Sequence, residues 1–149
     1  MSSILNIRNA LASALTNLSD LDDALAGYRV SPYPVSLPTP PLIEIAKFGV
    51  VYHQGMGRVS TQVKDISCVV RAYIAMASVE GSQMRADQFF EDDILAQAIE
   101  EGGSGSTADP TLGGLCSGLV VERADQAFWD HPTTGSLIVG GEWQVTILV

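Results

Sequence analysis

The strongest strand pattern in the chain is residues 61–77, which read TQVKDISCVVRAYIAMA. Alternate positions here are apolar, and one face of the segment receives Ile66, Cys68, Val70, Ala72, Ile74 and Met76. The other face receives Ser67, Val69, Arg71, Tyr73 and Ala75. A period of two is the spacing of a strand, so this stretch predicts a long strand around which a sheet forms.

Shorter segments complete the predicted fold. Residues 42–46, 115–124 and 137–149 predict three further strands, and residues 125–135 between the last two predict turns. Residues 3–18 and 82–100 place apolar side chains three and four positions apart, which is typical of amphipathic helices. The order of elements predicts an α+β fold, with two helices packed on one face of a mostly antiparallel four-stranded sheet.

Residues 28–41 differ in character from the rest of the chain, because they contain five of its seven prolines. Proline fixes φ and lacks a backbone N–H, so we expect neither a helix nor a central strand here. The segment also contains tyrosine, valine and leucine, which favours an ordered proline-rich strap along the surface. Two glycine-containing segments, 47–60 and 102–113, predict long loops.

Composition places the chain among globular proteins. It has 149 residues, of which 46% are hydrophobic and 17% are charged, and this length predicts a single domain. The charged fraction lies below the usual value of about 25%, so we expect part of the neutral surface to face another subunit. No stretch has a signal peptide's pattern or the roughly 20 apolar residues needed to span a bilayer. We therefore expect a soluble protein made in a reducing cytoplasm.

The formal net charge is −9, from 17 acidic and 8 basic residues. Proteins that grip duplex DNA through its phosphates need clustered basic residues, and those of this chain are scattered. The two cysteines, Cys68 and Cys116, are too few for a disulfide scaffold, and we expect both to be buried free thiols in strands.

Candidate chemical groups are few. Glu91, Asp92 and Asp93 are adjacent on a predicted helix and converge poorly on one metal ion, so we interpret them as a solvated helix face. The histidines, His53 and His131, lack partners at zinc-ligand spacing.

A hydrolase would need Ser104 or Ser117 beside His131 and Asp130, but no nucleophile-elbow motif precedes a helix. Residues 102–114 lack the lysine of a phosphate-binding loop, and the pair Gly55 and Gly57 lacks its third glycine. We therefore predict no catalytic, cofactor-binding or metal-binding residues and no enzyme activity.

The order of the parts resembles a family. The parts in order are the helix containing Ile7-Arg8-Asn9-Ala10-Leu11-Ala12, the strap leading into Leu42-Ile43-Glu44-Ile45, the segments 61–77 and 82–100, and the closing strand 141–149. In this order they are similar to the parts of tail terminator proteins of long-tailed bacteriophages of the siphovirus type. The resemblance covers most of residues 1–149 and implies one tail-terminator-like domain. It implies a virion protein at the head-proximal end of the tail, present in the host cytoplasm before assembly.

The resemblance also implies the partners. Such proteins assemble as a homohexameric ring on the tail tube, end its growth, and join the head–tail connector or stopper protein in the neck. DNA passes through the lumen without specific binding, and no membrane is involved; a negative lumen wall would repel its phosphates. We expect the loops 47–60 and 102–113 to contact neighbouring subunits or rings. The alternatives are a head-closure or connector protein, a tail tube subunit, and, more remotely, the small hydrolase.

Overall fold

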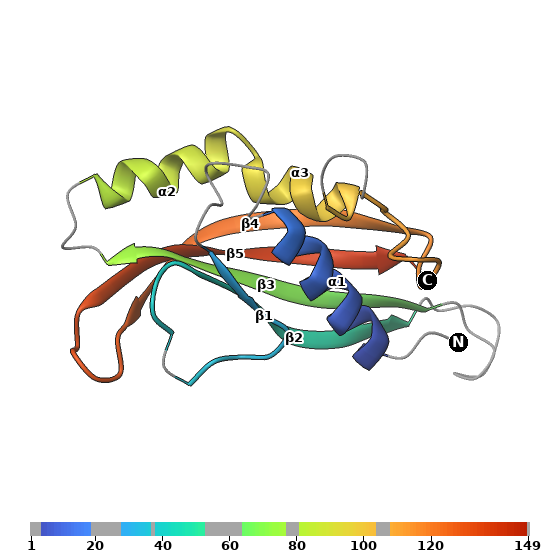
Figure 1. The fold of residues 1–149 in the computed structure, drawn as a ribbon, viewed down its shortest axis with the longest axis horizontal. Helices are drawn as coiled ribbons and strands as arrows, with labels where there is room; N and C mark the ends of the chain where they lie inside the picture. Colours follow the sequence, from blue (N-terminus) through green and yellow to red (C-terminus); the bar gives the residue numbers. More distant parts are fainter. Residues whose placement is uncertain are drawn as a thin grey trace.

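The computed structural model describes residues 4–18, 28–36, 38–52, 64–76, 81–103 and 108–148. The elements of this part of the chain form one layer of helices on one sheet (Figure 1). In order they are α1 (Ile4–Leu18), β1 (Arg29–Ser31), β2 (Leu42–Tyr52), β3 (Lys64–Met76), α2 (Ser82–Glu91), α3 (Ile94–Glu101), β4 (Gly118–Asp130) and β5 (Leu137–Leu148).

The sheet has five strands in the order β1-β2-β3-β5-β4. Strand β1 pairs with β2 in parallel, whereas the other three pairs are antiparallel. The predicted fold class is therefore wrong, because the described chain has three helices and a five-stranded mixed sheet in place of two helices on a four-stranded antiparallel sheet.

The extra helix arises from a break in the predicted helix 82–100. Helix α2 ends at Glu91, and α3 begins at Ile94 after Asp93 adopts the left-handed conformation with φ 51°. Aspartate has low helix propensity and tolerates this conformation better than most residues, so two successive aspartates end one helix and allow a second. The apolar spacing continues across the break and therefore did not reveal it.

The extra strand lies inside the proline-rich strap. Residues Arg29–Ser31 precede the first proline of the strap, and their backbone pairs with Leu42–Glu44 of β2. Two other strands are longer than predicted. Strand β2 continues to Tyr52, so the first part of the predicted loop 47–60 is strand and residues 53–60 lie outside the described part. Strand β4 continues to Asp130, through half of the segment predicted as turns.

The main core lies between the three helices and one face of the sheet. Helix α1 contributes the fully buried Ile7, Leu11 and Leu15, and α3 contributes Leu95 and Ile99. They pack against alternate side chains of the long strands, which include Ile43, Ile45, Cys68, Val70, Ala72, Trp143, Val145 and Ile147. Figure 1 shows α1 crossing the sheet, while α2 and α3 follow one another on the side of β4.

Two adjacent glycines in β5 let aromatic rings approach both faces of the sheet. A Cβ on Gly141 would overlap the ring of Phe90, which stacks on Trp143 with ring centroids 5.0 Å apart on the helix face. A Cβ on Gly140 would overlap the backbone carbonyl of Ala72 and would lie 2.9 Å from the ring of Trp129, on the opposite face. Only glycine leaves room for both rings, so this pair of residues fixes packing on the two sides at once.

Candidate functional site

The sheet face turned away from the helices contains a row of charged residues. The strand register aligns Glu44, Arg71, Glu142 and Asp125 across β2, β3, β5 and β4. The Arg71 guanidinium lies 3.2 Å from a Glu142 oxygen and 3.7 Å from Glu44 Oε1. Asp125 pairs with Arg123 at 2.7 Å. The row therefore crosses all four long strands, with Arg71 between Glu44 and Glu142 and with Asp125 beside Glu142.

Glu44 is the buried end of this row, with 1% of its surface exposed. The Tyr73 hydroxyl donates a hydrogen bond to its Oε1 at 2.7 Å, and the backbone N–H of Val35 donates to its Oε2 at 2.8 Å. Burial, together with the hydrogen bond to the Glu44 carboxylate, raises the pKa of Tyr73, so its hydroxyl stays a proton donor over the physiological range. A buried carboxylate with these partners ties the strap to the sheet.

The other anchor of the strap is Arg8 on α1. Its Nη1 donates to the backbone carbonyls of Pro32, Ile45 and Ala46 at 2.6, 2.7 and 3.2 Å. Its guanidinium lies 4.7 Å from the centroid of the Tyr33 ring and 4.4 Å from that of Phe48. After β1, the strap thus passes from the helix side at Pro32 to the opposite face at Val35, so it wraps around the edge of β2.

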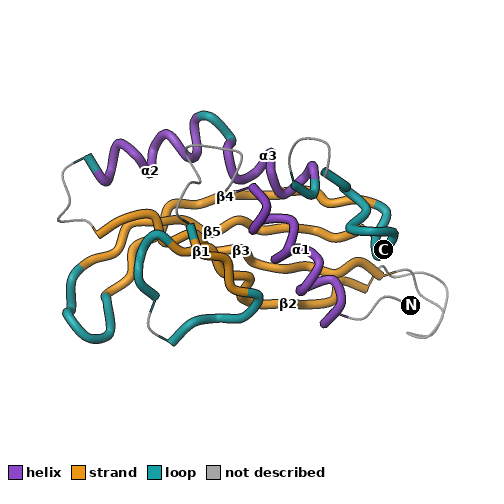
Figure 2. The backbone as a smooth tube through the Cα atoms, in the orientation of Figure 1, coloured by secondary structure: helices purple, strands orange, loops and turns teal. Residues whose placement is uncertain are grey.

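The strap covers only one end of the open face. Val35 packs there with Leu42, Tyr73, Ile138, Met76 and Trp129 in a second apolar cluster. Figure 2 shows the strap and the turn between β4 and β5 at this same end of the sheet. Toward the other end, Val120 and Leu148 are each more than a third exposed. In the described chain, no helix covers this part of the face.

The free edge of the sheet at β4 borders a groove of about 450 Å³ beneath α3. Its lining is mostly acidic or small and consists of Asp93, Ala96, Gln97, Glu100, Val121, Glu122, Arg123 and Ala124. Glu100 Oε1 accepts a hydrogen bond from the backbone N–H of Val121 at 3.3 Å, and a bulge follows at Glu122. A side-chain bond to an edge N–H and a bulge are both devices that limit unwanted strand pairing.

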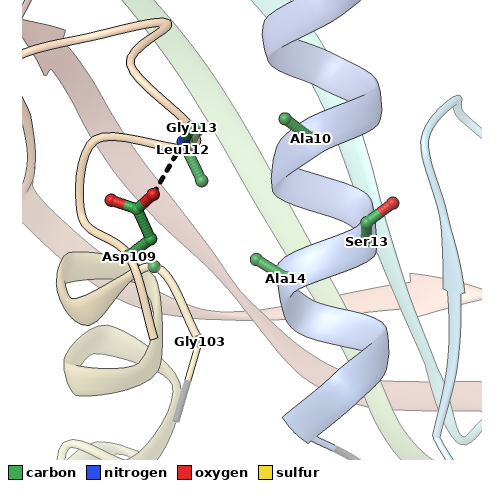
Figure 3. Close-up of a pocket in the computed structure, with 8 residues that line it drawn as sticks. Ala10, Ser13, Ala14, Gly103, Asp109, Leu112 and Gly113 are labelled. Atoms are coloured by element: carbon green, nitrogen blue, oxygen red, sulfur yellow. Dashed lines mark hydrogen bonds between the residues drawn. The ribbon is translucent and has the colours of Figure 1, made fainter. Parts of the chain in front are cut away.

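A smaller depression of about 260 Å³ lies between α1 and the segment after α3 (Figure 3). Ala10, Ser13, Ala14, Gly102, Gly103, Asp109, Leu112 and Gly113 line it. The Asp109 carboxylate accepts hydrogen bonds from the N–H and hydroxyl of Thr111 and the N–H of Gly113, and these bonds lower its pKa. In Figure 3 the Ser13 hydroxyl points away from Asp109. Asp109 thus serves to hold a turn rather than to activate a neighbouring group.

Among the described residues considered for a hydrolase, Ser117 does not lie beside Asp130 and His131. Ser117 and His131 flank the 13 residues of β4 at opposite ends, roughly 40 Å apart at the usual rise per strand residue. The Nδ1 of His131 accepts from the backbone N–H groups of Thr133 and Thr134 within its own turn. Ser104 and His53 lie outside the described residues.

The acidic run does not form a single helix face. Glu91 ends α2, and Asp92 and Asp93 occupy the junction with α3, where all three are exposed. Among the described residues, no group of three or more histidine, cysteine, aspartate or glutamate side chains is placed to hold a metal ion. In the same part of the chain, no helix is long and apolar enough to cross a bilayer.

Both cysteines are free and buried, as predicted. Cys68 lies in β3, and burial raises the pKa of its thiol to about 12. Cys116 lies in the turn before β4 and not in a strand, and burial raises the pKa of its thiol as well. Neither thiol is ionised near neutral pH, so neither is a ready nucleophile.

Sequence reasoning missed the charged row and the Arg8 anchor. It did place Arg71 and Tyr73 on one face of a strand, and it included Glu44 in a short apolar strand. An acidic residue surrounded by Leu42, Ile43 and Ile45 was the available indication of a buried ion pair. The register that joins Glu44 to Arg71 depends on the tertiary fold.

Comparisons with known proteins leave the chain without an assigned family. No protein-family model matches it, and a search of curated proteins found no significant match.

Proposed function

We propose that the protein is a structural virion protein that caps the tail tube of a long-tailed bacteriophage as a homohexameric ring. The ring ends tube growth and provides the surface that joins the head–tail connector or stopper protein. The observation that carries this proposal is the one-sided sheet, whose outer face is only partly covered by the strap. A sheet with a bare face and free edges is suited to bind neighbouring subunits.

The composition supports the same role. With 17% charged residues, the chain has few charged side chains for its length, and its exposed apolar side chains include Leu5, Met84, Phe128 and Leu137. These residues belong to α1, α2, β4 and the start of β5, so they are spread over several sides of the molecule. A ring subunit between a tube and a connector has contacts on several sides, which fits this distribution.

The charge balance supports passage of DNA through the ring. The charged row of the open face is nearly neutral, because Arg71 and Arg123 oppose its carboxylates. The exposed acidic surplus lies instead on α2, α3 and their junction, at Glu91, Asp92, Asp93, Glu100 and Glu101. We propose that part of this surplus faces the lumen, where it repels phosphates and lets DNA slide.

The decisive experiment is to measure the mass of the purified protein alone and in the presence of isolated tail tubes, with electron microscopy of the tube ends. We expect rings at tube ends and no extension of the tubes. Self-assembly into long tubes would favour a tail tube subunit, and binding to connector rings but not to tube ends would favour a head-closure protein. A gel-shift assay with duplex DNA near physiological salt is expected to show no retardation.

A further inference from the structure

The charges of the described elements are divided between the two edges of the sheet. The α2–α3 segment and β4, on one side, contain nine acidic residues and only two basic ones: Asp87, Glu91, Asp92, Asp93, Glu100, Glu101, Glu122, Asp125 and Asp130 against Arg85 and Arg123. On the other side, α1, β1 and β2 contain Arg8, Arg29 and Lys47 against the single buried Glu44. Strands β1 and β2 lie on one side of β3 and β5, and β4 with the neighbouring α3 lies on the other, whereas α1 crosses the sheet (Figure 1). One edge is therefore acidic and the other is basic.

The strand register places two exposed opposite charges at the ends of one row. Phe48, Cys68, Val145 and Val121 align across the sheet. Lys47 precedes Phe48 at the bulge of β2, and Glu122 follows Val121 at the bulge of β4. Both side chains are exposed. Each edge thus presents its charge at the same level of the sheet.

Strand direction is compatible with contact between unlike edges. Strand β4 runs opposite to β1 and β2, because three antiparallel pairings separate it from β2. A second copy placed beside the first would therefore meet β4 with its β1–β2 edge in antiparallel orientation. Contact between two β4 edges would instead bring Glu122 and Asp125 of both copies together, and facing like charges are destabilising.

From this geometry we infer that the α3–β4 edge of one copy binds the β1–β2 edge of the next copy, with Glu122 opposite Lys47. The inference deepens the proposed function, since it names the contact between neighbouring subunits of the proposed ring. The contact is heterologous, and repeated contacts of this kind close into a ring when the rotation per copy permits. The groove beneath α3 would receive the edge of the neighbour, and Asp93 and Glu100 would add to its negative charge.

Disulfide trapping tests which edges meet. Lys47→Cys and Glu122→Cys are made as separate proteins and mixed under mild oxidation; the native Cys68 and Cys116 are buried. We expect cross-linked dimers in the mixture and few with either variant alone. Lys47→Cys mixed with Met84→Cys is the matched control, because Met84 is 67% exposed on α2 and lies outside the proposed contact. Equal cross-linking in the control, or in Glu122→Cys alone, would overturn the inference.

A charge exchange provides a second test that does not depend on thiols. Glu122→Lys and Lys47→Glu should each lower the association constant about tenfold, because each creates a like-charge contact. The double variant should restore association to near the original value. Glu91→Lys makes the same charge change on α2 and should have little effect. All positions are exposed, and thermal unfolding checks that each variant is folded.

The outcomes separate this inference from the proposed function. If the unmodified protein forms rings at tube ends while the double variant fails to restore assembly and the Lys47–Glu122 mixture does not cross-link, the edge contact is wrong and the proposed function stands. If the unmodified protein stays monomeric in solution and at tube ends, both are wrong. Rings together with restored assembly support both.

Discussion

The buried carboxylate of Glu44 gives a sharp test of how the strap is held. Replacing Glu44 with alanine leaves the Tyr73 hydroxyl and the Val35 N–H without their acceptor, and leaves Arg71 with only Glu142 as its acidic partner. An unsatisfied buried donor costs about 1–3 kcal/mol and two such donors are left, whereas Arg71 is 32% exposed and keeps Glu142 as a partner. We therefore expect Glu44→Ala to lower the free energy of unfolding by about 3–5 kcal/mol.

The measurement is urea unfolding monitored by tryptophan fluorescence and circular dichroism. Glu44→Gln keeps the volume and one acceptor oxygen, so it should cost less than Glu44→Ala. Glu142→Gln is the matched control, because Glu142 contacts the same arginine but is 31% exposed. A partly exposed ion pair contributes little, so we expect a loss below about 1 kcal/mol in this control.

Amide hydrogen exchange adds a local measurement. If Glu44 holds the strap, the Val35 amide should exchange faster in Glu44→Ala, while amides of the β3–β5 ladder keep their relative protection. A loss of stability below about 1 kcal/mol in Glu44→Ala, or an unchanged Val35 amide, would refute the role assigned to this carboxylate.

Three further predictions concern packing, ionisation and the second strap anchor. Gly141→Ala should destabilise the protein by about 1–3 kcal/mol because its methyl group would overlap Phe90, whereas Gly118→Ala, with ordinary contacts, should cost less. Adding Gly141→Ala to a Phe90→Ala variant should cost less than adding it to the unmodified protein, and additive losses would contradict the overlap. Burial raises the pKa of Cys68 from 9.0 to about 12, so the protonated thiol stabilises the folded state fully below pH 9, and this stabilisation is lost as the pH rises toward 12. Cys68→Ala should therefore flatten the alkaline decline in the free energy of unfolding, and an unchanged slope would count against burial of the thiol as the cause of the decline. Arg8→Lys keeps the charge but loses the planar guanidinium between two rings and part of the bonding to three carbonyls, so chemical unfolding should show a loss of about 1–2 kcal/mol; a neutral result would show that charge alone suffices.

The sequence predicted the elements whose burial pattern is regular. Helix α1, strand β3 and strand β5 lie within the predicted segments 3–18, 61–77 and 137–149, because each buries one periodic face. Strand β4 is an edge strand with few buried side chains, so its second half lacks the alternation that marks a half-buried strand. Strand β1 exists through its pairing with β2, and no local pattern of three residues specifies such a partner.

The candidate surface was less predictable than the fold, for a related reason. Alternation assigns Arg71 and Tyr73 to one face of β3, but it cannot state that Glu44 lies beside them, because the bulge between Ile45 and Phe48 shifts the register of β2. Arg8 belongs to a helix whose apolar stripe predicts core packing, and its bonds to the strap and to β2 join segments 24 to 38 residues apart. The contacts of both groups of residues therefore depend on long-range strand register and on how far the Arg8 side chain reaches.

The difference between the two edges of the sheet also bears on how copies assemble. A subunit that ends tube growth needs contacts that close around the ring without offering a further copy the same contact along the tube axis. Contacts between the two unlike edges of one sheet meet this need, because each copy uses its acidic and its basic edge once and leaves α2 and the open face free. The mixed charges of the open face and the short, proline-flanked β1 both disfavour uncontrolled strand pairing. Control of copy number would then lie in the angle between neighbouring sheets, which sheet twist and the bulges at Lys47 and Glu122 set.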